Sequence, residues 1–222
     1  MRLVLCSEGF LTPNTVQACV ELVGKPQDEI SIAIINEAYA IEEGDKYWTI
    51  NNLNDAARNF KGGVDLVNLL ALSLEEMERR IANKDAIFIV GGNMDYLMSV
   101  FDKTGFSKLL PKLLETKVYV GSSAGSIILG KRLPTEAYEA IYGGPRDERA
   151  VVKYLELVDF AFLSHLNSAA FPNNNAEVLQ NACRDVAFPV YSLADDSAIV
   201  IDSDEMKFVG SKSIKIVDGK IV

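Results

Sequence analysis

The sequence is poor in residues that bind metals or form disulfides: its 222 residues include one histidine and three cysteines. The cysteines, Cys6, Cys19 and Cys183, are odd in number and widely spaced, which fits neither a disulfide framework nor a metal site. We therefore expect a cytoplasmic protein that needs no metal or other cofactor. Any catalytic group that uses a histidine of this chain as its base must use His165, because there is no other.

Basic residues are outnumbered by acidic ones, 22 to 31, and long apolar runs are lacking. The formal net charge of −9 argues against nucleic acid and anionic membranes as partners. No uncharged stretch reaches the roughly 18 residues of a membrane span, and the apolar start of the chain is too short for a signal peptide. No G-x-G-x-x-G motif follows the first predicted strand, which argues against a dinucleotide site. The oligomeric state stays open, with a homodimer as one option.

The sequence does show a regular alternation of strand-like apolar runs and helical segments. The runs lie at residues 3–6, 30–35, 64–70, 86–90, 118–120 and 160–164. Between them, Thr12-Pro13 opens a helix to residue 23, Ser73 caps a helix to residue 82, and Pro111 would kink or split a helix over 104–116. This order predicts a three-layer α/β fold, in which helices cover both faces of a mainly parallel sheet.

The last part of the chain has a different pattern. Short strand-like runs at 197–201, 206–209, 213–217 and 221–222 are joined by tight turns such as Asp218-Gly219. They predict an antiparallel meander on the edge of the sheet. No composition shift, repeat or low-complexity tract interrupts the chain, so we expect a single domain over residues 1–222.

The most informative motif is Gly121-Ser-Ser-Ala-Gly125, a G-x-S-x-G pattern between an apolar run and a helical segment. A strand, a sharp turn with one serine and a helix form the context of a nucleophile elbow, where small flanking residues make room for a strained serine. Ser123 would then be the nucleophile, and the Ala124 N–H would face the negative charge that develops on a substrate. The alternative is an ordinary turn rich in glycine and serine.

His165 ends the predicted strand at 160–164 and precedes a polar loop, so its ring is expected near solvent at a strand end. Open α/β sheets place their sites at such ends, although a structural histidine is the alternative. A catalytic histidine is usually oriented by a carboxylate. Asp195 and Asp196 lie in a tight connection between two apolar segments. Spacing alone does not choose between them, and solvated turn residues are the alternative for both.

Two further segments are candidates for binding. Gly91-Gly-Asn93 follows the run at 86–90, and paired glycines there let backbone N–H groups approach a ligand, as a second oxyanion donor must. A plain strand-to-helix turn is the alternative. Residues 131–149 are charged, aromatic and punctuated by Gly-Gly-Pro, as in a mobile lid. Arg132, Arg146 and Arg149 could clamp a peptide carboxylate there, or they could be solvated surface charges.

Taken in order, the turn Gly91-Gly-Asn93, the elbow, the run that leads to His165 and the segment Leu193-Ala-Asp-Asp-Ser-Ala198 resemble peptidase family S51. That family includes dipeptidase E and cyanophycinase, and its fold resembles that of the class I glutamine amidotransferases. The resemblance covers most of the chain, from about the second strand to the aspartate pair.

The resemblance implies Ser123 as nucleophile and His165 as base. The third catalytic residue of the family is acidic. When Leu193 is aligned with the leucine of the family's motif, Asp195 occupies the position of that acidic residue. The resemblance also implies oxyanion donors from the glycine turn and from the residue after the serine, which we assign to Gly92 and Ala124. We add Asn93, Arg132 and Arg146 as candidate substrate-binding residues.

Two features depart from the resemblance, one from the family's general pattern and one from dipeptidase E. Met94-Asp95 follows the glycine turn, where the family more often has threonine and an aromatic residue. Residues 166–175 contain no arginine or lysine, whereas dipeptidase E has basic residues there that are associated with binding the substrate's aspartate. The sequence is therefore closest to the uncharacterised bacterial peptidase-E-like branch, and an aspartate preference is not expected. We predict a serine hydrolase that cuts a small peptide, with an esterase or amidase, or a binding module without turnover, as alternatives.

Overall fold

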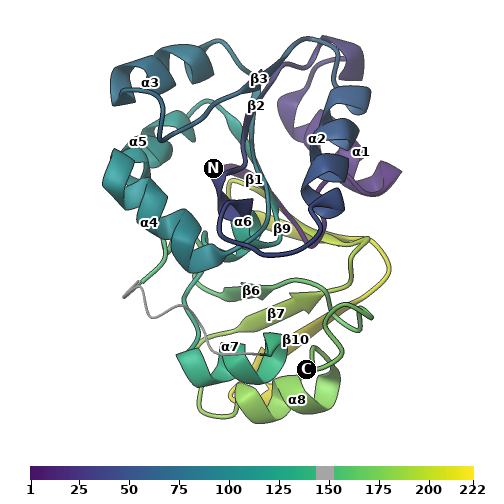
Figure 1. Ribbon diagram of the computed structural model, residues 1–222. Helices are drawn as coiled ribbons and strands as arrows, with labels where there is room; N and C mark the ends of the chain where they lie inside the picture. Colours follow the sequence, from purple (N-terminus) through teal and green to yellow (C-terminus); the bar gives the residue numbers. More distant parts are fainter. Residues whose placement is uncertain (144–152) are drawn as a thin grey trace.

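Figure 1 shows the computed structural model, which describes residues 1–143 and 153–222. Its larger part is a seven-stranded sheet with helices on both faces, which confirms the predicted fold class. The strands lie in the order β3 (Val64–Leu66), β2 (Ile32–Ile35), β4 (Ala86–Ile89), β5 (Val118–Ser122), β1 (Arg2–Cys6), β8 (Ala198–Asp202) and β9 (Glu205–Val209). The first five are parallel, and β8 and β9 add antiparallel strands at one edge.

The two faces of this sheet bury separate apolar cores. In β1, Leu3 and Leu5 belong to one core, whereas Val4 and Cys6 belong to the other, because successive residues of a strand point to opposite faces. One face is covered by α1 (Pro13–Val23) and α2 (Tyr47–Asn59), and the other by α3 (Leu74–Ala82), α4 (Met94–Thr104), α5 (Phe106–Leu113) and the short α6 (Ala124–Ile127). Burial on both sides explains why the central strands are continuous apolar runs.

Local sequence signals set several helix boundaries. The helix α1 begins after Thr12, as predicted, and Ser73 caps α3. The predicted helix at 104–116 is wrong in its limits, because Gly105, with a φ of 79°, separates α4 from α5. The break falls there rather than at Pro111 because glycine adopts the left-handed conformation at little cost. Among the helices in the described ranges, none has the length and apolar character needed to cross a lipid bilayer.

Two predicted strands are shorter than their apolar runs. Only residues 32–35 of the run 30–35 and residues 64–66 of the run 64–70 pair with a neighbouring strand. Ile30, Val67 and Leu69 are nevertheless buried. Apolar character therefore marks burial here, and it does not distinguish a paired strand from a buried loop.

A second, smaller sheet lies below the first in Figure 1. Its order is β11 (Lys220–Ile221), β10 (Ser213–Val217), β7 (Val190–Leu193) and β6 (Ala161–Leu163), and α7 (Thr135–Tyr142) and α8 (Ala176–Ala182) lie beside it. The prediction was wrong in placing the run 160–164 in the main sheet and all the C-terminal strands on its edge. Only β8 and β9 lie on that edge. The elbow strand β5 already pairs with β4 and β1, and β1 pairs with β8, so no edge near the elbow is open to β6.

Candidate active site

The turn after β5 holds Ser123 in a strained backbone conformation. Its φ of 47° and ψ of −112° lie outside the regions that L-residues usually occupy, as in a nucleophile elbow. Its N–H points at the carbonyl oxygens of Cys6 and Ser7, at 3.2 and 3.0 Å. These contacts fix the turn against the end of β1 and offset the backbone strain.

Close packing around the turn requires the small residues of the motif. A Cβ atom at Gly121 would lie 2.6 Å from the backbone nitrogen of Ser126, and one at Gly125 would lie 2.2 Å from the carbonyl oxygen of Ile89. Real Cβ atoms essentially never approach other atoms this closely. The Ser126 hydroxyl donates to the Cys6 carbonyl at 2.7 Å, which gives it a structural role. The pattern therefore reflects how tightly strand, turn and helix pack.

His165 follows β6 and reaches across from the smaller sheet to the elbow. Its Nε2 lies 3.0 Å from the Ser123 hydroxyl oxygen. Its backbone has a φ of 70°, and its N–H donates to the Ser7 hydroxyl at 2.8 Å. The ring stacks on Phe171, with centroids 4.7 Å apart. The imidazole is thus held from the backbone and from one face of the ring.

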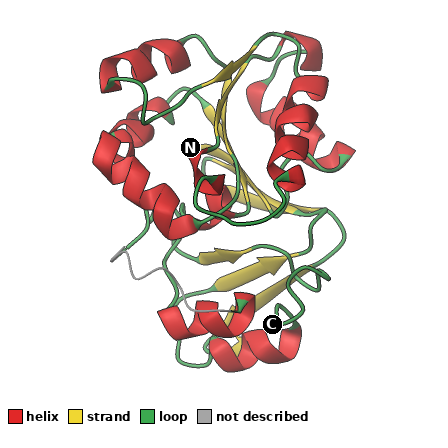
Figure 2. Ribbon diagram, viewed as in Figure 1, coloured by secondary structure: helices red, strands yellow, loops and turns green. Residues whose placement is uncertain are grey.

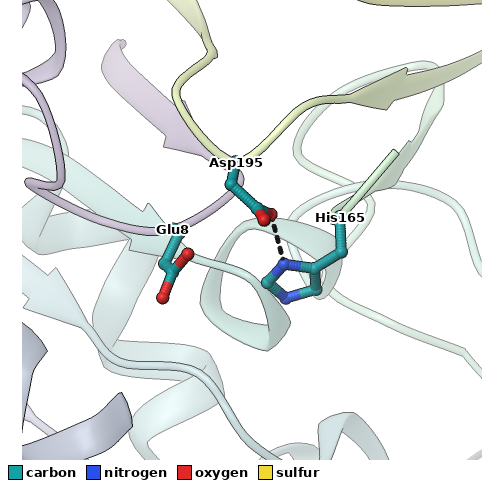
Figure 3. A group of neighbouring side chains, drawn as sticks. All are labelled: Glu8, His165 and Asp195. Carbon is teal, nitrogen blue, oxygen red and sulfur yellow. Dashed lines mark hydrogen bonds and ion pairs between the residues drawn. The ribbon is translucent and has the colours of Figure 1, made fainter. Parts of the chain in front are cut away.

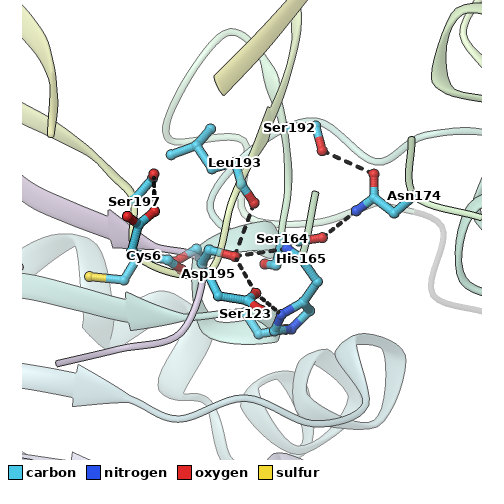
Figure 4. A network of polar contacts seen from close by, with 12 residues as sticks. Cys6, Ser123, Ser164, His165, Asn174, Ser192, Leu193, Asp195 and Ser197 are labelled. Atoms are coloured by element: carbon cyan, nitrogen blue, oxygen red, sulfur yellow. Dashed lines mark hydrogen bonds and ion pairs between the residues drawn. The ribbon is translucent and has the colours of Figure 1, made fainter. Parts of the chain in front are cut away.

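Asp195 follows β7, and its Oδ1 lies 2.6 Å from Nδ1 of His165 (Figure 4). Burial raises the pKa of this carboxyl, but its hydrogen bond and electrostatic attraction to His165, together with hydrogen bonds from Ser168 and Ser7, outweigh burial, so the pKa lies below its ordinary value. An ionised Asp195 accepts the Nδ1–H of a neutral imidazole, which leaves Nε2 free to accept the Ser123 proton. Asp196 points elsewhere, and its Oδ1 accepts from the Ser211 hydroxyl at 2.7 Å.

Ser7, which the sequence reasoning missed, joins the two sheets. Its hydroxyl accepts the His165 N–H and lies 3.1 Å from the Leu193 carbonyl oxygen and 3.4 Å from Oδ1 of Asp195. Ser7 and the next residue, Glu8, follow β1 at the same sheet edge as the elbow. That position was the signal in the sequence, because open sheets bind ligands at the carboxyl ends of their strands.

The glycine turn after β4 presents backbone to the same site. Gly92 has a φ of 131°, and a Cβ there would lie 2.4 Å from the Ala38 carbonyl oxygen, so only glycine fits. The Asn93 side chain caps α4 by accepting the Tyr96 N–H at 2.9 Å. Within residues 1–143 and 153–222, neither the Gly92 N–H nor the Ala124 N–H has a backbone acceptor. Gly92 lines the cleft described below, whereas Ala124 is buried at the start of α6.

These groups line a cleft of about 530 Å³. The side formed by elements of the main sheet contributes Glu8, Glu42, Trp48 and Asn52, and the side near the smaller sheet contributes Tyr138, Tyr142 and Phe171. Ser123, His165, Asp195, Gly92 and Asn93 line the same cleft. The structure therefore brings together one serine, one histidine, one carboxylate and a glycine turn.

The predicted arginine clamp is not assembled at this cleft by the described residues. Arg132 does not line the cleft, and its Nε lies 3.8 Å from Oδ1 of the buried Asp95. Its guanidinium also lies over the ring of Tyr154, 5.9 Å from the centroid. Arg146 and Arg149 lie outside the described residues.

Glu8, His165 and Asp195 could in principle hold a metal ion, because one ligand atom from each lies within 4.8 Å of the others (Figure 3). Both nitrogens of the imidazole, however, already have protein partners, Nδ1 in Asp195 and Nε2 in Ser123. To bind a metal ion, His165 would have to lose one of these two hydrogen bonds. The donor set therefore fits a hydrogen-bonded relay with a nearby second carboxylate better than a metal centre.

Comparisons with known proteins identify the family of the chain. The family model of peptidase family S51 matches residues 14–209. An uncharacterised peptidase of Listeria innocua is 27% identical over 60% of this chain and 63% of its own length. An uncharacterised peptidase of Pasteurella multocida is 24% identical over 83% of this chain and 87% of its own length.

Two solved structures share the fold. A candidate peptidase E protein of Listeria monocytogenes EGD-e superposes with a TM-score of 0.74 at 24% identity, over 95% of this chain and 98% of its own. A peptidase from an acI-B1 actinobacterium gives a TM-score of 0.67 at 15% identity, over 100% of this chain and 96% of its own. The family match extends from α1 to β9 and includes the elbow, the glycine turn and the Asp195 segment. The chain belongs to peptidase family S51, as its ordered motifs predicted.

Proposed function

We propose that the protein is a serine-type hydrolase that cleaves small peptides through Ser123, His165 and Asp195. One observation carries the proposal: Ser123 Oγ lies 3.0 Å from His165 Nε2, and His165 Nδ1 lies 2.6 Å from Asp195 Oδ1. Both distances are within hydrogen-bond reach, as a nucleophile, its base and the residue that orients the base require. Membership of a peptidase family supports peptide-bond chemistry at this site.

In the proposed reaction, Ser123 Oγ attacks the carbonyl carbon of the scissile bond while His165 Nε2 takes the hydroxyl proton. The N–H groups of Gly92 and Ala124 donate to the oxyanion. Asp195 stabilises the imidazolium, which then protonates the leaving amine. A water molecule, deprotonated by His165, hydrolyses the acyl-enzyme and regenerates the serine.

The cleft supports a small substrate. Its volume of about 530 Å³ falls in the range of pockets that enclose single small molecules. The aromatic side chains of Tyr138, Tyr142 and Phe171 line the cleft, which suits the apolar parts of a short peptide. We therefore propose di- or tripeptides as substrates rather than folded proteins.

A fluorophosphonate probe tests the proposal, because it reacts only with an activated serine. We expect labelling of Ser123, located by peptide mapping, and none in Ser123→Ala. Ser122→Ala, which removes the neighbouring hydroxyl, is the matched control and should still be labelled. Silence of the wild-type protein would favour a binding module, and labelling without hydrolysis of any dipeptide in a library would favour an esterase or amidase.

A further inference from the structure

The segment that carries His165 continues from an edge strand. Among the described strands, β6 pairs with β7 alone, and the chain runs on from β6 through Ser164 into His165. An edge strand presents backbone N–H and C=O groups that no neighbouring strand satisfies. Ser164 is fully buried, so its backbone groups need partners from another part of the protein.

Tyr142, the last residue of α7, provides these partners. Its hydroxyl accepts the Ser164 N–H at 3.0 Å and donates to the Ser164 carbonyl oxygen at 3.1 Å. One hydroxyl thus binds both backbone groups of Ser164, as the backbone of a further strand would. The same carbonyl also accepts from Nδ2 of Asn174, whose Oδ1 accepts the Ser192 hydroxyl at 3.1 Å (Figure 4).

The peptide group between Ser164 and His165 is therefore held at both ends. Tyr142 and Asn174 donate to its carbonyl oxygen, and its N–H donates to the Ser7 hydroxyl. His165 has a φ of 70°, which residues other than glycine rarely adopt without support from their surroundings. Rotation of this peptide group would swing the imidazole away from its partners. The Tyr142 hydroxyl consequently acts on the position of the imidazole through a single peptide group.

The ring of Tyr142 acts on the imidazole by a second route. It packs edge-to-face on Phe171, with centroids 5.4 Å apart and an interplanar angle of 88°. Phe171 in turn stacks on the His165 ring at 4.7 Å and 20°. Edge-to-face and stacked contacts are both favourable arrangements of aromatic rings. The Tyr142 ring therefore supports the ring that covers one face of the imidazole.

We infer that Tyr142 is a positioning residue for the proposed reaction: its hydroxyl and its ring hold His165 where Nε2 faces Ser123 and Nδ1 faces Asp195. This inference rests on the proposed function and adds α7 to the two sheets that build the site. Tyr142 acts through Ser164 and Phe171. Because Tyr142 also lines the cleft, a role in substrate binding alone is the competing explanation, and it predicts a different result.

Two readouts test the inference. His165 is the only histidine, so its ring nitrogens give a single set of signals in NMR spectra of nitrogen-labelled protein, and their chemical shifts report which nitrogen carries the proton. The second readout is the rate at which the fluorophosphonate labels Ser123, separated into the maximal rate and the probe concentration that gives half of it.

Tyr142→Phe removes the hydroxyl and keeps the ring. We expect the neutral imidazole of the wild type to carry its proton on Nδ1, and the variant to show a mixture of both tautomers. The maximal labelling rate should fall about tenfold, with little change in the half-saturating concentration. Tyr142→Leu, which also removes the ring, should lower the rate further. Tyr191→Phe is the matched control from β7, because its ring packs on Phe160 and Phe208, and it should change neither readout.

The outcomes separate the inference from the proposed function. If the fluorophosphonate does not label wild-type Ser123, the proposed function fails and the inference fails with it. If Ser123 is labelled and Tyr142→Phe leaves the tautomer or the maximal rate unchanged, only the inference is overturned. A higher half-saturating concentration at an unchanged maximal rate overturns it too, because Tyr142 would then bind the ligand only. Circular dichroism checks folding. If Tyr142→Phe does not fold, Phe171→Leu tests the ring route, and an unchanged tautomer and rate there would overturn the inference.

Discussion

The two sheets contribute different halves of the candidate site. The main sheet provides Ser123 after β5 and Gly92 after β4. Both turns pack tightly against backbone atoms, so that a Cβ would not fit at Gly92, or at Gly121 and Gly125 on either side of Ser123. The smaller sheet provides His165 and Asp195, which hydrogen bonds connect to the main sheet through Ser7. Close packing thus builds the half that contains Ser123, whereas polar contacts between the sheets hold the half that contains His165.

The two halves therefore differ in how firmly their geometry is fixed. A turn fixed by backbone packing keeps its geometry when a side chain elsewhere changes. A histidine held by three polar contacts and one ring stack is more sensitive to the loss of any of them. Substitutions in the first half should therefore act on the chemical step directly, while those in the second should act through the position of the imidazole.

The largest effect is expected from removing Ser123, the proposed nucleophile, from the main-sheet half. Ser123→Ala should lower kcat by about 10⁴-fold or more with the fold intact, because members of such a relay act as a unit. Ser122→Ala and Ser126→Ala should cost far less. The measurement is kcat on a dipeptide selected from a library. Comparable activity in Ser123→Ala and the wild type would remove the serine from the mechanism.

Substitutions of Asp195 and Asp196 test the half of the candidate site that the smaller sheet provides. Asp195→Asn should lower kcat by about 10³- to 10⁴-fold, because the amide favours the wrong imidazole tautomer. Asp196→Asn is the matched control and should be nearly neutral, since Asp196 accepts from the Ser211 hydroxyl instead. Because the pKa of Asp195 lies below its ordinary value, its hydrogen bond to His165 should persist until acid brings the pH through that lowered value. A large loss in Asp196→Asn with an active Asp195→Asn would reverse the assignment.

The same comparison explains what the sequence could predict. The elbow and the glycine turn are local motifs, and their glycines are required by contacts with the immediately following or neighbouring segments. The strand–helix alternation likewise follows from periodicity and caps. The alternation and the turns were predicted correctly because the residues that mark them follow one another in the sequence, even where the contact that requires a glycine comes from another segment, as Ala38 does for Gly92.

The contacts between the sheets could not be predicted in this way. Nothing in the run 160–164 shows that β6 pairs with β7 rather than joining the main sheet, because both positions bury an apolar strand. The choice of Asp195 came from a family resemblance, since adjacent turn aspartates are equivalent by spacing. Ser7 and Glu8 were missed because their partners lie more than 150 residues further along the chain.

A substitution in the glycine turn measures how rigid the main-sheet half must be. Gly92→Ala would require a positive φ of an alanine and would place a Cβ 2.4 Å from the Ala38 carbonyl oxygen. The turn must shift, and its N–H would no longer meet the oxyanion, so kcat should fall about 10²- to 10³-fold. KM should change less. The control Gly143→Ala has open space around its Cβ, although its φ is also positive. Unchanged kcat in Gly92→Ala would exclude the Gly92 N–H as an oxyanion donor.

Ser7→Ala breaks the polar connection between the two sheets. The buried His165 N–H would lose its acceptor, so the imidazole should become less well positioned without changing chemically. We expect kcat to fall about tenfold, with a destabilisation of about 1–2 kcal/mol in urea unfolding. Ser7→Cys, which keeps a weak acceptor, should recover part of the activity. A full-activity Ser7→Ala would mean that Phe171 and Asp195 alone position the ring.

The smallest effect concerns stability and Glu8, an acidic residue of the cleft. Because the pKa of Glu8 in the folded protein lies above its ordinary value of 4.5, the folded state binds the proton more tightly than the unfolded chain. Ionised Glu8 therefore lowers stability, and this cost develops as the pH rises through and above 4.5. Glu8→Gln should raise Tm at pH 7, by roughly 1–2 °C, and lose this advantage below pH 4. Scanning calorimetry of Glu8→Gln at both pH values measures the difference, and Glu43→Gln, which removes an exposed carboxylate of the same cleft, is the control. A lower Tm for Glu8→Gln at pH 7 would contradict this, because it would show that the ionised carboxylate stabilises the fold and that contacts of Glu8 in the folded protein outweigh its burial beside Asp195.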